Sequence, residues 1–332
     1  MLRFAPLSAL ALAVALAACG DGATDPDDPS GTDPTDPGVT DTTAPTLASS
    51  APAHGAMGVA ADTTLTLQFS EPMDTESVED QLDTTELGAV GLSWNLANDA
   101  LTITPDLALD VATGPIDGFV EASSYRVIVG DDARDVAGNP LGDTVEVEFR
   151  VERELWARIP AVDRLSRTIT PSELVFAVED PLVIGDDADN EGWRATMTFE
   201  LAGLPGDPSE VVDAFLTTEQ LPEERSGAPF DGLGTLTLDH VVFTELDSES
   251  AINGAFNASQ AATRTYGGIA SSHEHVDIEV DVTDAVNADL EGTLGSSQFL
   301  LYFDGFTDLD DTIDRAVFSR EKLRLEVSYR VP

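Results

Sequence analysis

The densest group of metal-ligating side chains beyond residue 43 is a run of aspartates near the C-terminus. It comprises Asp304, Asp308, Asp310, Asp311 and Asp314. Carboxylate oxygens are the ligands that Ca²⁺ prefers, so we expect a candidate structural calcium site at Asp304, Asp308, Asp310 and Asp311. A second acidic group spans residues 186–189. Neither follows EF-hand spacing, so solvated acidic loops are the competing interpretation, and no cofactor is required.

Aromatic side chains are the second source of binding chemistry. A saccharide site offers aromatic faces for stacking beside a few convergent polar groups. The candidates are Trp156, Trp193, Tyr266 and Tyr302. The chain is only 6% aromatic, so burial in a core competes with ligand binding for each of them.

Catalytic motifs are absent from the sequence. There is no Gly-x-Ser-x-Gly, no His-Glu-x-x-His and no phosphate-binding loop. His273 and His275 would share a face of a strand and could meet a zinc ion with His240 as a third ligand, but a solvated pair is the simpler interpretation. We expect that the protein is not an enzyme.

The charge balance restricts the partners. The chain carries 62 acidic and 16 basic residues, a formal net charge of −46. Such a field repels nucleic acid and anionic lipid headgroups, so we expect no nucleic-acid partner. Solubility of an exposed protein and adaptation to external salt are the two main explanations.

The N-terminus has the pattern of an export signal. Arg3 precedes an uncharged run over residues 4–18, which is too short to span a bilayer. Leu16-Ala17-Ala18-Cys19 then resembles the lipobox of bacterial lipoproteins. The resemblance implies a signal peptide over 1–18 and lipidation of Cys19, hence attachment to the outer membrane or cell surface. Because Cys19 is the only cysteine, the mature chain has no internal disulfide.

Residues 19–43 form a candidate tether. The segment after Cys19 is rich in Asp, Pro and Thr and has no aromatic residue. It cannot bury enough apolar surface to offset the entropy of ordering. Repeated prolines favour extended polyproline II, which would reach about 75 Å. We interpret it as a disordered spacer.

The pattern of residues 44–152 predicts a β-sandwich. Residues 63–69 and 145–151 alternate apolar and polar side chains, and turn clusters at 70–72, 98–99 and 138–140 separate the expected strands. Phe69-Ser70-Glu71-Pro72-Met73-Asp74 followed by Asp135-Val136-Ala137-Gly138-Asn139-Pro140-Leu141 resembles the bacterial Ig-like domain of the S-layer-associated type. The resemblance implies a spacer or presentation module. Residues 108–123 are longer than the usual link in that family.

Residues 153–332 are also β-rich, so the whole chain is expected to be all-β. Alternation recurs at 275–282 and 323–331, and 299–303 is apolar on both faces, as in a central strand. Thr283 or Asp284 would cap a short helix through Ala288. The lead into Trp193-Arg194, residues 281–286, and Phe318-Ser319-Arg320-Glu321 before Leu323 resemble the DNRLRE jelly-roll domain, a relative of carbohydrate-binding modules.

Two functions follow from these resemblances. In the first, a lipid anchor attaches the protein to a membrane, the Ig-like module is a spacer and the distal jelly roll binds polysaccharide. In the second, the protein is a structural or adhesive envelope component that binds protein partners and no glycan.

Overall fold

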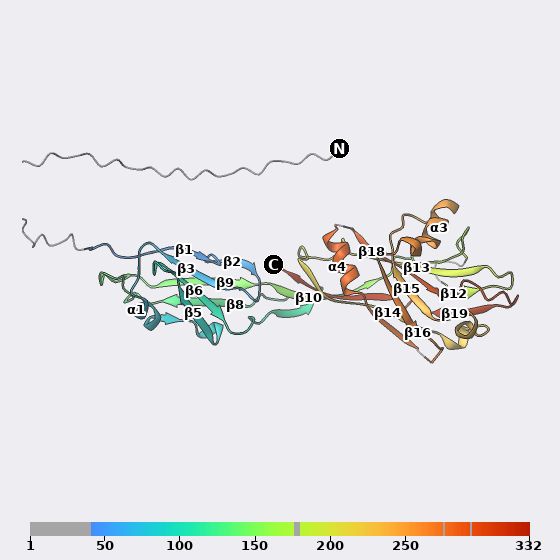
Figure 1. Cartoon of the computed structure of the whole chain (residues 1–332), viewed down its shortest axis with the longest axis horizontal. Coiled ribbons are helices and arrows are strands. Elements are labelled where there is room, and N and C mark those ends of the chain that lie inside the picture. The colour runs from blue at the N-terminus through green and yellow to red at the C-terminus, as the bar shows by residue number, and fades with distance from the viewer. Residues whose placement is uncertain (1–40, 176–179, 275, 293) are drawn as a thin grey trace, which may run out of the picture. The chain divides into compact units, whose positions relative to one another are not determined.

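The structure is a computed structural model that describes residues 41–175, 180–274, 276–292 and 294–332 (Figure 1). It confirms the predicted all-β class: short strands dominate and helices are few. Residues 42–332 form one compact unit. The predicted signal peptide, Cys19 and the tether up to residue 40 lie outside the described residues. Within the described part, no helix is both long and apolar enough to cross a bilayer.

The first part is a sandwich of two four-stranded sheets. The sheet orders are β1-β3-β6-β5 and β2-β9-β8-β4. Strict alternation puts Leu65, Leu67 and Phe69 inside, where they pack with Phe149 in one core. The strands are β1 (Leu47–Ala51), β2 (Ala56–Val59), β3 (Leu65–Phe69), β4 (Leu82–Asp83), β5 (Val90–Trp94), β6 (Ala100–Pro105), β8 (Ser124–Val129) and β9 (Val145–Val151).

Two helical turns connect strands of this sandwich. They are α1 (Thr75–Asp80) and the 3₁₀ turn η1 (Thr85–Leu87). Asp74 caps α1, since its carboxylate accepts a hydrogen bond from the Ser77 amide at 3.4 Å. The helix buries Val78 in the core.

The second part is a larger sandwich of two sheets. One has the order β17-β14-β20-β10-β7, and the other is a seven-stranded sheet whose main path is β16-β15-β18-β13-β12-β19, with β11 paired to β13. Its strands are β10 (Arg153–Pro160), β11 (Thr168–Ile169), β12 (Leu182–Asp186), β13 (Gly192–Glu200), β14 (Glu210–Glu219), β15 (Leu236–His240), β16 (Arg264–Ala270), β17 (Asp277–Asp281), β18 (Ser296–Phe303), β19 (Asp314–Phe318) and β20 (Arg324–Val331).

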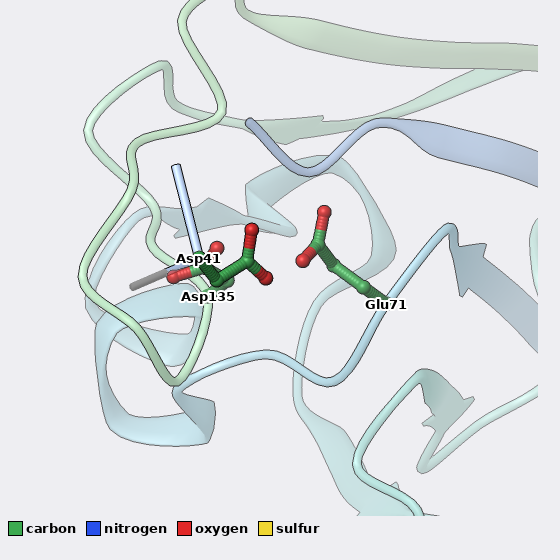
Figure 2. Close-up of side chains that lie close together, drawn as sticks. All are labelled: Asp41, Glu71 and Asp135. Carbon is green, nitrogen blue, oxygen red and sulfur yellow. The ribbon is translucent and has the colours of Figure 1, made fainter. Parts of the chain in front are cut away.

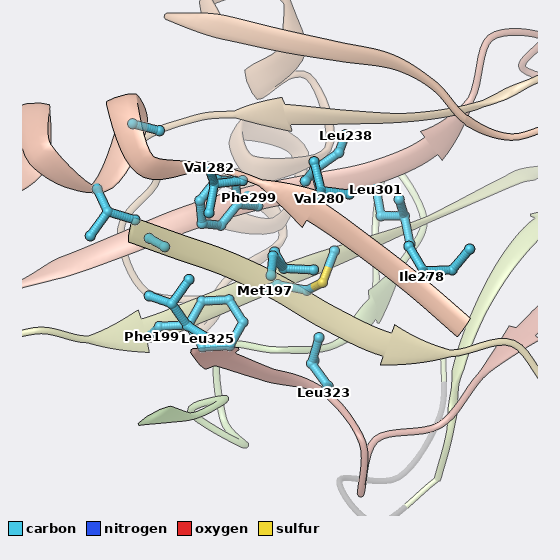
Figure 3. Packing of buried hydrophobic residues seen from close by; sticks show 14 of the residues in the cluster. Met197, Phe199, Leu238, Ile278, Val280, Val282, Phe299, Leu301, Leu323 and Leu325 are labelled. Carbon is cyan, nitrogen blue, oxygen red and sulfur yellow. The ribbon is translucent and has the colours of Figure 1, made fainter. Parts of the chain in front are cut away.

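One hydrophobic core lies between these two sheets (Figure 3). Met197, Phe199 and Phe299 enter it from the seven-stranded sheet, and Leu325 and Val280 enter it from the five-stranded sheet. Strand β18 lies between β15 and β13, the central position that its apolar character on both faces predicts. A smaller cluster contains Ile169 together with Ile252 and Phe256, which helix α3 contributes.

Helices in this part are short and lie in the connections. They are η2 (Pro222–Glu224), α2 (Pro229–Gly232), α3 (Glu249–Phe256), η3 (Ala258–Ala261) and α4 (Thr283–Glu291). The helix predicted after residue 282 is present as α4, but the predicted cap residue is wrong. Val282 occupies the N-cap, and the Asp281 carboxylate accepts hydrogen bonds from the amide and hydroxyl of Thr283.

The long 108–123 segment contributes a strand to the second sandwich. Strand β7 (Ala112–Pro115), within this segment, pairs in parallel with β10. The register pairs Ala112 with Arg153 and Pro115 with Trp156. The edge of the five-stranded sheet is therefore made by a segment that precedes β8 and β9 of the first sandwich. This pairing gives the extra length noted in the sequence a structural role.

Candidate functional sites

Three aspartates from distant positions in the sequence gather at one end of the seven-stranded sheet. Asp186 ends β12, Asp314 begins β19, and these two are direct cross-strand partners. Asp308 joins them from the connection between β18 and β19. One carboxylate oxygen of each residue lies within 4.8 Å of the others. Asp186 is 0% exposed and Asp314 is 4% exposed, so the acidic cluster is largely buried.

Hydrogen bonds satisfy only part of the acidic cluster. Asp314 accepts from the Ala228 amide at 2.5 Å and from the Thr312 hydroxyl at 2.9 Å. Asp186 Oδ2 accepts a long bond of 3.4 Å from the Asp308 amide. Asp186 Oδ1 and Asp308 Oδ1 are buried and have no partner among the described residues. Neither oxygen has the hydrogen bond that a buried acceptor normally makes.

The electrostatics of the cluster disfavour three ionised carboxylates. Burial raises the pKa of Asp186 and outweighs the lowering effect of hydrogen bonds from the Thr307 side chain and the Asp308 amide, while the charges of Asp308 and Asp314 raise it further. Burial also raises the pKa of Asp308, to which Asp310 and Asp314 add repulsion. None of the ion pairs formed within the described ranges involves these three residues. Among the residues that the structure describes, none therefore supplies the cluster with a cation at ion-pair distance.

The other aspartates of the predicted calcium set have protein partners. Asp304 accepts from the hydroxyl of Thr237 at 2.5 Å and from that of Thr235. Asp310 accepts from the amide and hydroxyl of Thr312 at 2.8 and 2.7 Å. Asp311 accepts from the Asn190 amide group at 2.7 Å. Of the predicted set, only Asp308 belongs to the buried cluster.

Trp156 occupies a different surface, the outer face of the five-stranded sheet. Along β10, Leu155, Ala157 and Ile159 are buried, so Trp156 and Arg158 point outward. The indole is 45% exposed, and the Arg158 guanidinium lies 6.0 Å from its centroid. A hydrophobic ring is thus presented to solvent on a rigid strand.

Two grooves lie on this sheet, one lined by the Trp156 ring and the other adjoining it at Glu326. The first, of about 310 Å³, is lined by residues that include Trp156, Arg158, Asp213, Phe215 and Ser328. The second, of about 500 Å³, is lined by Thr217, Glu279, Lys322 and Arg324 among others. Glu326 belongs to both grooves and pairs with Arg158 at 3.2 Å and Arg324 at 2.7 Å. We call this surface, from Trp156 to Lys322, the β10–β20–β14 face.

The remaining predicted aromatics belong to the seven-stranded sheet. Tyr302 donates a 2.8 Å hydrogen bond to Asp239, and burial raises the pKa of its phenol to about 12. Its ring packs 4.8 Å from the guanidinium of Arg194. Trp193 pairs with Gly185 in the sheet, and Tyr266 packs against the main core. Of the four aromatic candidates, only Trp156 is exposed.

Both ring nitrogens of His240 already have protein partners, so the side chain is not positioned to share a metal ion with His273. It is 3% exposed, and its Nε2 lies 2.8 Å from Asp289 while its Nδ1 lies 2.5 Å from the Thr263 hydroxyl. His273 instead contacts Arg225 and the ring of Phe230. His275 lies outside the described residues. The buried His240–Asp289 pair joins β15 to α4.

Two further acidic side chains lie close together in the first sandwich. The carboxylates of Glu71 and Asp135 approach within 4.8 Å (Figure 2). Asp135 is 2% exposed, and its carboxylate accepts two bonds of 2.8 Å from the backbone amide and side chain of Asn139. Asp135 thus organises the turn that the motif at residues 135–141 encodes.

Sequence reasoning placed Asp314 in the same acidic run as Asp308 but left it out of the candidate calcium ligands, and it did not bring Asp186 to them. It also missed Arg158, Phe215 and Lys322 on the face that carries Trp156. The acidic partners come from strands 128 residues apart in the chain, paired in the register Asp186 with Asp314. The only sequence signal was that each aspartate lies at a boundary of an apolar run. Register decided which aspartates would meet.

Comparisons with solved structures return matches at low similarity. PcoC, a methionine-rich copper resistance protein from Escherichia coli, is 21% identical over 33% of this chain and 99% of its own, with a TM-score of 0.24. The N-terminal part of the bacterial S-layer protein SbsC is 12% identical over 48% of this chain and 41% of its own, also at 0.24. These scores are too low to support a functional argument.

Comparisons at the level of sequence are more specific for the first sandwich. No curated protein matches the chain. Residues 41–151, however, match the family of bacterial Ig-like domains, which confirms the resemblance drawn from the motifs at residues 69–74 and 135–141.

Proposed function

We propose that this protein is a lipid-anchored component of the bacterial cell surface whose second sandwich binds polysaccharide on the β10–β20–β14 face. The exposure of Trp156 on a rigid strand carries the proposal. A flat aromatic ring beside polar grooves suits a sugar, whose C–H face stacks on the ring while its hydroxyls meet polar groups. The Ig-like domain and the tether would act as spacers that hold this face away from the membrane.

The second sandwich is, in this proposal, a jelly roll related to the DNRLRE domain. Two observations support this. The second sandwich consists of two mostly antiparallel sheets around one core, and its last strand, β20, lies at the centre of the sheet proposed to bind the ligand. Phe215, Glu326 and Arg158 are successive cross-strand neighbours there. They would extend the Trp156 platform with one apolar and two polar groups.

The proposed activity is binding without turnover. His240, Asp289 and Ser297 are residue types found in catalytic sites, but all three side chains are buried. Ser297 donates to Asp289 at 2.6 Å and is not paired with the imidazole, so it lacks the adjacent base that activates a serine nucleophile. This network is suited to holding α4 in place.

A glycan array with the full chain, followed by affinity electrophoresis in gels containing the best ligand, tests the proposal. We expect Trp156→Ala to weaken binding at least about tenfold, because tenfold corresponds to about 1.4 kcal/mol and stacking on an aromatic ring contributes on that order. The indole emission of the wild type should shift to shorter wavelength on binding.

Phe119→Ala is the matched control, since Phe119 is 91% exposed but lies outside the β10–β20–β14 face. It should bind as the wild type does. A blank array, or equal binding by Trp156→Ala and the wild type, would reject the glycan site. A specific envelope protein retained by the wild type but not by Trp156→Ala would instead favour the adhesive function.

A further inference from the structure

We propose that Asp186, Asp308 and Asp314 bind one Ca²⁺ that fastens strand β12 to strand β19 and to the loop between β18 and β19. Oxygens that share a calcium ion at roughly 2.4 Å lie at most about 4.8 Å apart. The three carboxylates supply one oxygen each within that separation. The site is independent of the proposed glycan-binding face.

The energetic reason is the burial of like charges. Removing an ionised carboxylate from water costs several kcal/mol unless it is paired or coordinates a metal. Asp186 and Asp314 are almost fully buried as direct neighbours in the sheet, and Asp308 adds a third charge. A divalent cation is the most economical counter-charge, because the described residues supply no basic side chain there.

An unpartnered buried oxygen points to the same ligand. Asp186 is fully buried, yet its Oδ1 makes no hydrogen bond within the described part of the chain. Asp308 Oδ1 is likewise buried without a hydrogen-bond partner among the described residues. A hydrogen-bond donor would normally satisfy such atoms. Two acceptors left open in one acidic cluster are the arrangement that a cation completes.

Glycines hold the backbone close against the cluster. A Cβ at Gly227 would lie 2.2 Å from Asp314 Oδ1, and one at Gly232 would lie 2.1 Å from Asp308 Oδ2. Gly227 also has a φ of +64°, which favours glycine. The backbone therefore lies close against both carboxylates, and at Gly227 the positive φ and the nearby Ile313 carbonyl favour glycine.

Hydrogen bonds tie the surrounding loop to the turn between β12 and β13. Asn190, in the turn between β12 and β13, donates to Asp311 at 2.7 Å and lies 3.3 Å from the Thr307 hydroxyl. These contacts position Asp308 beside Asp186. Since all three side-chain donors are carboxylate oxygens, a hard cation is selected, and an irregular site suits Ca²⁺ better than the octahedral Mg²⁺.

Thermal unfolding of the full chain in EDTA, in Ca²⁺ and in Mg²⁺ at matched ionic strength tests the site. We expect Ca²⁺ to raise the Tm of the wild type and Mg²⁺ to raise it much less. Asp186→Asn should lose the Ca²⁺-dependent rise. In EDTA it should unfold at the wild-type temperature or above, because the substitution removes a buried charge. Asp314→Asn provides a second variant should Asp186→Asn fail to fold.

Asp247→Asn is the control for non-specific binding to an acidic surface, since Asp247 is exposed in the connection between β15 and α3, away from the loop that carries Asp308. It should keep the wild-type response to Ca²⁺. The proposal is overturned if the wild-type Tm is the same in Ca²⁺ and EDTA. It is equally overturned if Mg²⁺ acts as strongly as Ca²⁺, or if Asp186→Asn and Asp314→Asn retain the full shift.

Discussion

The backbone amide of Ile116 donates a 3.1 Å hydrogen bond to the carbonyl of Trp156. Ile116 follows β7, in the long segment of the Ig-like domain, and Trp156 carries the exposed ring of the second sandwich. The edge that supports the proposed binding surface is thus contributed by the first domain. A domain expected to act only as a spacer also completes the sheet of its neighbour.

Ile116→Pro tests this relationship. Proline has no N–H, so the bond to Trp156 is lost and the carbonyl keeps no partner from β7. We expect the free energy of unfolding in urea to fall by about 1 kcal/mol and the binding of any ligand at Trp156 to weaken. Ile116→Ala keeps the amide and serves as the control. Equal stability of the proline and alanine variants would contradict this role for β7.

The tyrosines predict an alkaline limit to stability. The chain has four tyrosines, and burial raises the pKa of each: that of Tyr125, that of Tyr266, and those of Tyr302 and Tyr329 to about 12. A raised pKa in the folded state contributes stability below pH 10 that is lost as pH rises toward 12. Spectrophotometric titration at 295 nm should therefore show tyrosinate forming together with unfolding. A reversible titration of a folded protein centred near pH 10 would exclude this.

Asp135→Ala tests how much the Asp135–Asn139 turn stabilises the Ig-like domain. Burial alone would raise the pKa of Asp135, but hydrogen bonds from the Asn139 side chain and from backbone amides lower it below its ordinary value. Because these bonds go to a charged group, we expect a loss of about 1–3 kcal/mol in the free energy of unfolding.

The sign of the pH dependence follows from that lowered pKa. The stabilisation by Asp135 is present above pH 3.8 and is lost as pH falls through the folded-state value. The difference in stability between wild type and Asp135→Ala should therefore shrink in acid. Urea titrations at pH 7 and below pH 4 measure it, with Asp131→Ala, an exposed neighbour in the same connection, as the control. A difference that is independent of pH would contradict this account.

Cys19→Ser tests the lipid anchor. Without the thiol no acyl chain can be attached, so we expect the protein to leave the membrane fraction and to lose labelling by an alkyne fatty acid. Because Cys19 is the only cysteine, no other thiol can substitute. Persistent membrane association of the serine variant after a high-salt wash would contradict anchoring at this position.

The sequence by itself determined the all-β class, the Ig-like domain and many of the strand positions. These are local properties: alternation of side chains sets the buried face of a strand, and the Asp135–Asn139 turn is encoded by residues four apart. The lipobox predicted at Cys19 is likewise a contiguous pattern, so predicting it needs no knowledge of the fold.

Tertiary structure decided which distant residues meet. Asp308 was predicted to bind calcium with its sequence neighbours, yet the register of β12 against β19 places it with Asp186 and Asp314. Among the four candidate aromatics, only the folded structure separates the exposed Trp156 from Trp193, Tyr266 and Tyr302, which are partly buried in the seven-stranded sheet. Pairing of β7 with β10 is equally invisible in the sequence, because sheet pairing depends on which edges remain open after each core has formed.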